Sequence, residues 1–272
     1  MGKKMLAFLL SFMIFMGMGM EALASPEQNW EAIYGALSRH DTSVTFHSDS
    51  AIEWDSIAKL AMSDDGRNGT YYWLEMFQYD SGFYTQFSPS NYEHTLKFNY
   101  PYGLEQSKRF EHKLKSVVTK LCSDAESDLE KVEAINDYII DHVEYDYDTL
   151  NGEDRYGYTA YGALINGKAV CQGYAILFYR MGKEAGLDVK YVSGMAGERG
   201  ERGLHAWNIV KVGRRYYNID VCWNDPGDYD FYDGNEYFLL NNRDFKMHQR
   251  NPEYNTAEFN GTYRMGKHSI GY

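Results

Sequence analysis

The sequence predicts an α+β protein in which a helix that begins with a cysteine packs on an antiparallel sheet. Three observations lead to this fold class. Two amphipathic helical patterns lie in the middle of the chain, a glycine-rich turn then opens into an apolar helical run, and two β-favouring runs follow. The helix would carry Cys171, and the sheet would carry His205 and Asp220.

The first 24 residues have the features of a secretory signal peptide. Lys3 and Lys4 form a basic start, residues 5–20 are apolar, and Ala22-Leu23-Ala24 fits a cleavage site. We therefore expect a cut after Ala24 and a secreted or extracellular protein. An uncleaved membrane anchor is the alternative, but the short apolar run and the cleavage site argue against it. Cleavage would leave no integral membrane anchor.

Residues 25–104 are predicted to form an α/β extension, either a separate small domain or a segment packed on the core. No residue here suggests a particular chemistry. The expected elements are helices at 31–37 and 52–62 and strands at 43–47, 71–79 and 94–100.

Two helices are expected next, at residues 105–122 and 129–143, because apolar side chains recur there at helical spacing. Ser127 with Glu130 three residues later fits a capping box at the start of the second helix. Residues 144–148 alternate acidic and tyrosine side chains, and we expect a solvated acidic loop there.

Cys171 stands between Gly167 and Gly173, at the point where a turn opens into the apolar helical run 175–185. Unpaired N–H groups and the positive end of the helix dipole stabilise an anion at such a point. A thiolate is such an anion, so the position favours a nucleophilic cysteine.

His205 and Asp220 supply the groups that a nucleophilic thiol needs, a base and a residue that orients the base. The runs around them, 204–210 and 216–225, are predicted strands joined by a turn at Gly213. An antiparallel hairpin would place His205, near the start of one strand, beside Asp220, near the end of the other. The two side chains should then lie within hydrogen-bonding distance.

Three ordered motifs, VCQGYA, HAWNIV and YYNIDVCWND, resemble the transglutaminase-like superfamily over about residues 129–245. The resemblance implies a papain-like core, which we bound at residues 105–250. It also implies Cys171 as nucleophile, His205 as base and Asp220 as orienting residue. The implied activity is thiol-dependent acyl transfer on peptide or protein amides, with water or an amine as acceptor. The alternatives are a cysteine peptidase or amidase acting on cell-wall or extracellular peptides, and a non-catalytic binding module on the same scaffold.

In the implied mechanism His205 takes the thiol proton, and the thiolate attacks an amide carbonyl to give a thioester. The backbone N–H of Cys171 and a second donor would hold the oxyanion. The candidates for that second donor are Gln172, Tyr161 and Trp207, and the sequence does not choose among them.

A zinc site built from Cys171, His205 and Cys222 is the competing interpretation of the same residues. The resemblance implies no metal there, and no C-x-x-C pair supports one, so we expect neither a metal nor another cofactor. Cys122 and Cys222 could form a disulfide, but we favour two small buried side chains. The acidic residues 228–236 do not fit the ligand spacing of a calcium loop.

The remaining predictions concern the segments around the site. We expect a strand at 189–192 and a glycine-rich loop at 194–203, either a flexible lid or a simple connection. A further strand is expected at 237–240, and the C-terminal tail 251–272 is expected to be irregular.

Composition limits the partners. The chain has 272 residues, of which 44% are hydrophobic and 24% charged, as in globular proteins. Its formal net charge of −12 disfavours nucleic acid, whose phosphates would be repelled. The same charge favours cationic partners, such as lysine-bearing proteins or cell-wall amines.

Overall fold

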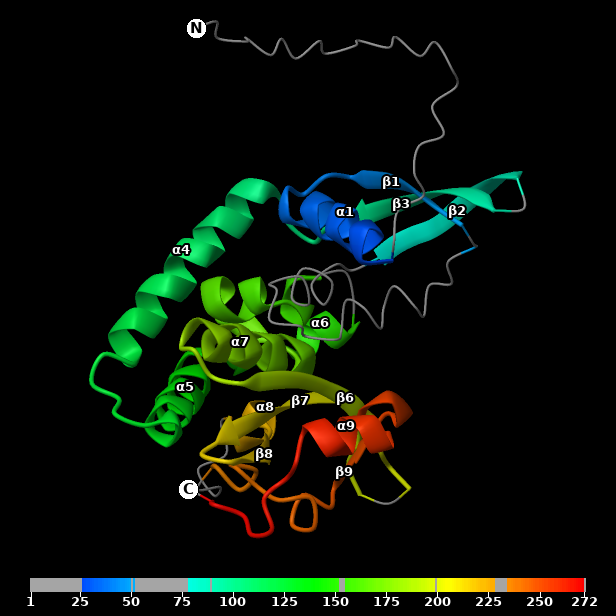
Figure 1. Ribbon diagram of the computed structural model, residues 1–272. Helices are drawn as coiled ribbons and strands as arrows, with labels where there is room; N and C mark the ends of the chain where they lie inside the picture. Colours follow the sequence, from blue (N-terminus) through cyan, green and yellow to red (C-terminus); the bar gives the residue numbers. More distant parts are fainter. Residues whose placement is uncertain are drawn as a thin grey trace, which may run out of the picture.

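The computed structural model (Figure 1) describes most of the chain between Pro26 and residue 271. The signal-peptide prediction, the helix expected at 52–62 and most of the strand expected at 71–79 lie outside the described residues. No helix in the described part of the chain is long and apolar enough to span a membrane. The described residues are 26–49, 51, 78–88, 90–151, 155–198, 200–227 and 234–271.

Helix α7, Cys171–Glu184, is the central element of the core. It contacts helices α4, Leu104–Leu121, and α5, Asp128–His142, and it also contacts the strands of the main sheet. Figure 1 shows the two green helices on one side of α7 and the sheet on the other. Because α7 is covered from both sides, ten of its residues are buried, from Gly173 to Gly182.

Both predicted helices before α7 are present, and their apolar faces point to the core. Phe110, Leu114 and Val118 are the buried apolar residues of α4, spaced four residues apart. Helix α5 begins with the predicted capping box. The backbone N–H of Glu130 donates to Ser127 Oγ at 3.2 Å, and Glu130 Oε2 accepts from the Ser127 N–H at 3.1 Å.

The main sheet has four antiparallel strands in the order β8-β7-β6-β9. The predicted hairpin is its centre: β7 pairs with β8 from Val212↔Arg215 to Asn208↔Ile219, and Gly213 in the turn has a φ of 61°. The strand predicted at 189–192 is longer than expected, so the loop before β7 is shorter than 194–203. The strands are β6 (Val189–Ala196), β7 (Gly203–Val212), β8 (Arg215–Ile219) and β9 (His248–Arg250).

The N-terminal residues form a sheet and a core of their own. A three-stranded antiparallel sheet in the order β1-β3-β2 packs with one helix. Trp30, Ile33 and Leu37 of that helix are buried in a cluster with Phe46 and Leu96 of the sheet. The elements are α1 (Pro26–Ser38), β1 (Ser43–Ser48), β2 (Gln78–Ser88) and β3 (Asn91–Asn99).

The prediction of a solvated acidic loop at 144–148 is wrong. Glu144–Tyr145 is strand β4, which pairs in parallel with β5, Lys168–Ala169. Asp146 is 8% exposed and is held by the Thr149 hydroxyl, which donates to Oδ2 at 2.7 Å. Short elements connect β4 to β5: α6 (Tyr147–Asn151), the 3₁₀ turn η1 (Tyr156–Tyr158) and the π-turn η2 (Gly162–Asn166).

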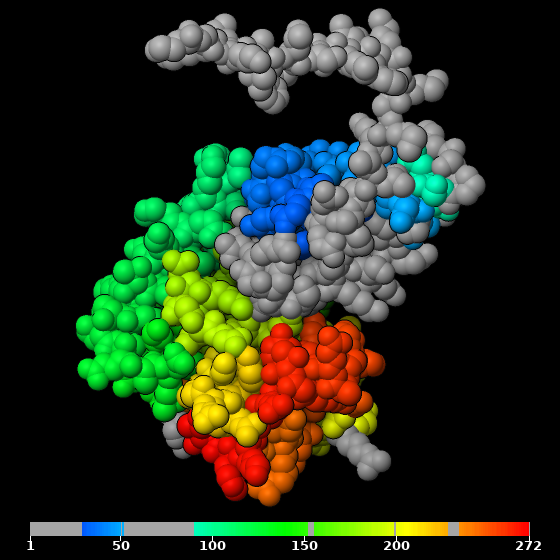
Figure 2. Space-filling model, in the orientation of Figure 1, coloured from blue at the N-terminus to red at the C-terminus, as the bar shows by residue number. Residues whose placement is uncertain are grey.

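Two predictions for the C-terminal part are also wrong. Residues 237–240 form turns rather than a strand, with a single bridge between Leu240 and Asn218. The tail is ordered rather than irregular, since it forms the 3₁₀ turn η3, Pro252–Asn255, and helix α9, Ala257–Thr262. Figure 2 shows these C-terminal residues, in orange and red, beside the yellow segment that contains β7 and β8.

Gly173 allows η1 and strand β5 to lie close against the first turn of α7. A Cβ atom there would lie 2.6 Å from Gly157 O and 2.7 Å from Ala169 Cβ, which is too close. Val170 N–H also donates to Gly157 O at 2.9 Å, so the two segments are fixed together.

We therefore expect Gly173→Ala to lower the free energy of unfolding by about 1–3 kcal/mol, the usual cost of overpacking. Urea titration measures this loss. Gly261→Ala is the matched control, because nothing lies within 4 Å of its added Cβ and it sits in helix α9. An equal effect of both substitutions would show that the close approach at Gly173 is unimportant.

Candidate active site

Cys171 is the first residue of α7 and follows the N-cap residue Val170. No side chain caps this helix end, so the first N–H groups of α7 remain available at the cysteine. The Cys171 side chain is half-buried, and the residue is a free cysteine. The position is therefore the one that the sequence predicts.

His205 and Asp220 lie side by side, as the predicted hairpin requires. His205 Nε2 donates to Asp220 Oδ2 at 2.6 Å, and the two side chains are 7% and 1% exposed. Asp220 directly follows β8 and serves as N-cap of the short helix α8, Val221–Asn224, so its Oδ1 accepts from the Trp223 backbone N–H at 3.2 Å. The carboxylate is thus fixed by the end of one strand and the start of one helical turn.

The charges in this group favour an ionised pair. Burial alone would lower the pKa of His205, but the charge of Asp220, its hydrogen bond and hydrogen bonding with Cys171 raise that pKa to about 10. Burial opposes ionisation of Asp220, yet the charge and hydrogen bond of His205 hold the pKa of this carboxyl well below its usual range. Because Nε2 is used by Asp220, Nδ1 is the ring nitrogen left for Cys171.

Asp220 also binds a second imidazole, which sequence reasoning did not include in the site. His248, the first residue of β9, donates from Nε2 to Asp220 Oδ2 at 2.8 Å. The two residues are 28 positions apart, and the strand expected at 237–240 does not form between them. No spacing rule in the sequence points to this contact.

A cleft of about 370 Å³ opens beside His205. Aromatic and aliphatic side chains dominate its wall, and Tyr147 and Leu150 are 67% and 54% exposed. Asp225 adds one carboxylate, to which the Tyr174 hydroxyl donates at 2.6 Å. The residues that line the cleft include Tyr145, Tyr147, Leu150, His205, Trp223 and Asp225.

The other two cysteines are unpaired, but both are half-buried rather than buried as predicted. Cys222 belongs to α8 and also lines the cleft. Burial and the nearby charges of Asp220 and Cys171 raise the pKa of the Cys222 thiol well above its usual value. Burial likewise raises the pKa of Cys122. Both are therefore poor nucleophiles at neutral pH.

The three candidate oxyanion donors lie in different surroundings. Gln172 is half-buried and follows Cys171 at the start of α7. Tyr161 is buried against the rings of Tyr102 and Tyr156. The Trp207 Nε1 atom is buried without a hydrogen-bond partner among the described residues.

His205, Asp220 and His248 offer donor atoms that lie within 4.8 Å of one another, a set of two imidazoles and a carboxylate. Such donors can bind a transition metal. The atoms concerned, however, already make the two hydrogen bonds at 2.6 and 2.8 Å. A bound ion would have to replace both bonds. These three residues differ from the zinc ligands considered from the sequence, which were Cys171, His205 and Cys222.

If the chain turns over amides, the raised pKa of His205 predicts an alkaline limit to that turnover. The imidazolium must protonate the leaving amine, and it persists until pH rises through about 10. Above that pH, kcat should fall about tenfold per unit for one lost proton. The ion pair also contributes stability that is complete below the ordinary histidine pKa of ~6.5 and is lost as pH rises through about 10. A pH series of kcat tests this prediction. The His205→Ala variant should lack the alkaline decline in kcat. A wild-type profile without an alkaline decline would contradict the prediction.

Residues 115–221 match a sequence profile of the transglutaminase-like superfamily. Over 118 residues the chain is 35% identical to kyphoscoliosis peptidase from Mus musculus and 34% identical to that from Homo sapiens. These matches cover 40% of this chain, and the chain spans 18% of the length of each relative.

Two solved structures match the chain with low TM-scores. One is described as a candidate cysteine protease from Cytophaga hutchinsonii, with 14% identity, a TM-score of 0.35, and coverage of 54% of this chain and 65% of that one. Another is called a TGase, with 19% identity, a TM-score of 0.34, and coverage of 77% and 54%. At these scores neither structure adds to the assignment.

The sequence profile spans the nucleophile position, the predicted base and the orienting aspartate, and these are the residues that the fold brings together. The family supports a thiol-dependent enzyme. Residues 115–221 of this chain are thus similar to the transglutaminase-like superfamily.

Proposed function

We propose that this protein carries out thiol-dependent acyl transfer on peptide or protein amides through a thioester on Cys171. The observation that carries the proposal is the order of groups at the start of α7. Cys171 interacts with His205, and His205 Nε2 donates to the buried Asp220 at 2.6 Å. This order is the one expected of the nucleophile, base and orienting residue of a thiol triad.

The reaction has two stages. The Cys171 thiolate attacks the amide carbonyl carbon, and the backbone N–H groups at the start of α7 stabilise the oxyanion. His205 then gives its proton to the leaving amine as the C–N bond breaks, which leaves a thioester. In the second stage water or a primary amine attacks the thioester and loses a proton to His205, and the thiolate leaves.

The cleft supports a polypeptide substrate. Its exposed Tyr147 and Leu150 offer apolar contact, and Leu204, next to His205, is 85% exposed. Side chains of this kind bind apolar residues of an extended peptide. The carboxylate of Asp225 and the net charge of −12 favour a substrate or acceptor that carries an amine.

One experiment tests the proposal and separates the two acceptors. The purified protein is incubated with glutamine-containing peptides, with and without a primary amine, and the products are analysed by mass spectrometry. Deamidated or cleaved peptide shows that water is the acceptor, and an amine adduct shows transamidation. A Cys171→Ala sample run in parallel removes any contaminating activity. No product with any peptide in a panel of varied sequence would contradict acyl transfer on amides.

We also propose that the protein acts outside the cell, because Lys3, Lys4 and the Ala22-Leu23-Ala24 sequence fit a signal peptide. The mature chain should then begin at Ser25. N-terminal sequencing of protein recovered from culture medium checks this start. Membrane-bound protein that retains Met1 would favour the anchor instead.

A further inference from the structure

His248 reaches the site from the edge strand of the main sheet. Strand β9 pairs with β6 through Ala196↔His248, Met195↔Gln249 and Gly194↔Arg250. Gly194 permits this pairing, because a Cβ there would clash with Gln249 O and would lie 2.9 Å from Trp207 Cη2. The approach of β9 to β6 thus places the His248 ring next to Asp220.

One carboxylate oxygen serves both imidazoles. Asp220 Oδ2 accepts from His205 at 2.6 Å and from His248 at 2.8 Å. The other oxygen, Oδ1, accepts from the Trp223 N–H. The carboxylate is therefore held by three donors from three segments of the chain, and the His248 side chain is 1% exposed.

The protonation states follow from these contacts. Asp220 is ionised and can only accept, so His248 Nε2 must carry a hydrogen. Burial lowers the pKa of His248 below its ordinary value, although the hydrogen bond and charge of Asp220 act in the opposite direction. The lowered pKa favours the neutral ring with its hydrogen on Nε2. Nδ1 is buried without a hydrogen-bond partner among the described residues, so the ring offers no route for passing a proton on.

Aromatic rings fix the orientation of His248. Phe245 stacks on it with centroids 3.8 Å apart at 19°, and Trp223, Trp207 and Tyr237 lie at 4.6, 5.0 and 5.5 Å. An imidazole packed in this way cannot rotate without displacing its neighbours.

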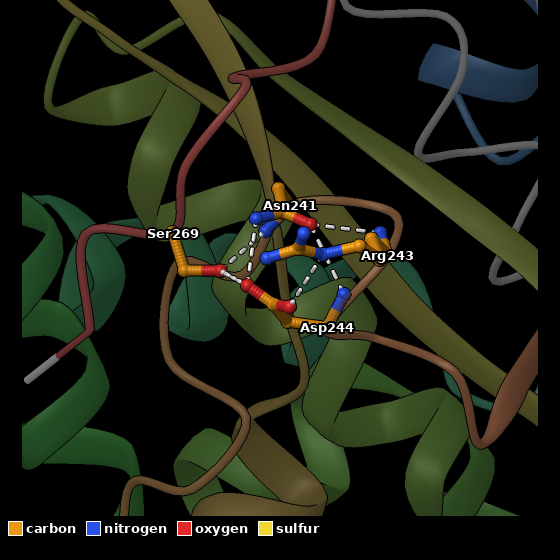
Figure 3. Close-up of polar contacts among 4 residues, drawn as sticks. All are labelled: Asn241, Arg243, Asp244 and Ser269. Carbon is orange, nitrogen blue, oxygen red and sulfur yellow. Dashed lines mark hydrogen bonds and ion pairs between the residues drawn. The ribbon is translucent and has the colours of Figure 1, made fainter.

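The segment that carries Phe245 is itself tied down. Figure 3 shows Asn241, Arg243, Asp244 and Ser269 joined by hydrogen bonds. Asn241 Oδ1 accepts from the Arg243 and Asp244 backbone N–H groups at 2.7 and 3.0 Å, and Ser269 Oγ donates to Asp244 Oδ2 at 2.7 Å. The C-terminal segment thus fixes the turn that precedes His248.

We propose that His248 is a positioning residue for the triad: its Nε2–H donates to Asp220 and holds the carboxylate in the orientation that receives the His205 ring. This inference rests on the proposed function. His248 does not touch the reacting atoms, and it acts through Asp220 and then His205. Without its hydrogen bond, Asp220 can turn away from His205, and the imidazolium loses part of its stabilisation.

The test compares two substitutions at His248. His248→Leu removes the donor, and we expect kcat to fall roughly 10- to 100-fold, the range for lost outer hydrogen bonds, with KM little changed. The alkaline limb of kcat should move to lower pH, because a loosened Asp220 raises the pKa of His205 less. His248→Gln keeps an N–H donor near the same place and should recover most of kcat and return the limb toward its wild-type position.

His94→Leu is the matched control. His94 is a buried histidine in β3 of the N-terminal sheet, which has a core of its own, and it hydrogen-bonds with Ser48 Oγ at 2.8 Å, so kcat should not change. A purely structural role for His248 would lower Tm in the Leu variant without moving the alkaline limb, and that result would overturn the proposal. So would unchanged kcat in a folded His248→Leu protein.

A measurement on the wild-type protein keeps the proposal testable if the variants do not fold. In protein with ¹⁵N-labelled histidine, long-range proton–nitrogen NMR spectra should show His248 as the neutral Nε2–H tautomer at neutral pH. An Nδ1–H tautomer, which leaves Nε2 without a hydrogen, would contradict the inference. This NMR measurement does not need turnover. A failure of the proposed function can therefore be distinguished from a failure of the inference about His248.

A metal at the same three side chains is the alternative that this test also addresses. Dialysis of the wild-type protein against a chelator should leave kcat and the NMR tautomer unchanged. If activity is lost and Zn²⁺ restores it, the hydrogen-bonded arrangement is not the working state, and the proposal is overturned.

Discussion

Replacement of Cys171 by alanine should reduce amide turnover by on the order of 10³-fold or more while the protein stays folded. Removal of the nucleophile from an acyl-transfer triad abolishes the covalent route, and only binding and oxyanion contacts remain. The side chain is half-buried at the start of α7, so loss of one sulfur atom should cost little stability. The measurement is kcat on the peptide identified by mass spectrometry.

Cys122→Ala is the matched control for this loss. Cys122 is also half-buried and free, but it caps the end of α4 rather than starting α7 beside His205. We expect its kcat to remain near that of the wild type. A Cys171→Ala protein with full activity would remove the thioester from the mechanism.

Asp220→Asn should lower kcat by roughly 10- to 10³-fold. Loss of the orienting residue in a serine triad costs ~10⁴, and a thiol enzyme should lose less because its ion pair is partly preformed. The uncharged amide cannot stabilise the His205 imidazolium. His205→Ala should cost at least as much, and the double variant little more, because residues that act as a unit are not additive.

The structure adds a stability cost to this substitution. All three groups around the Asp220 carboxylate are donors, namely His205 Nε2, His248 Nε2 and the Trp223 N–H. An asparagine NH₂ must face at least one of them, so we expect a loss of about 1–3 kcal/mol from an unsatisfied buried donor. Circular dichroism during thermal unfolding measures this part separately. A well-folded Asp220→Asn protein with full kcat would exclude Asp220 from the mechanism.

Local signals in the sequence were enough to predict the centre of the fold. The capping box at Ser127 is made by neighbouring residues, and the β7–β8 hairpin is set by the turn at Gly213. Both depend on contacts within a few positions of the chain, which spacing can reveal. The placement of His205 beside Asp220 follows from that hairpin.

The features that the sequence did not predict depend on packing between residues that are far apart in the chain. Residues 237–240 have β-favouring side chains, but Phe238 and Leu239 are fully buried in the main core, and the backbone turns to place them there. The tail is ordered because Tyr254 and Phe259 are buried in a cluster with Trp207 and Phe245. His248 meets Asp220 only after this packing is complete, so no local pattern could have shown it.

The most direct test of the account is the order in which the three cysteines of the native protein react with iodoacetamide near neutral pH, mapped by peptide mass spectrometry. We predict that Cys171 reacts first and that its rate falls in the His205→Ala protein, because the imidazolium stabilises the thiolate. Cys122 and Cys222, whose thiol pKa values are raised, should react slowly in both proteins. If Cys122 or Cys222 is alkylated before Cys171, or if Cys171 reacts equally fast without His205, the central claim that Cys171 is the activated nucleophile is wrong.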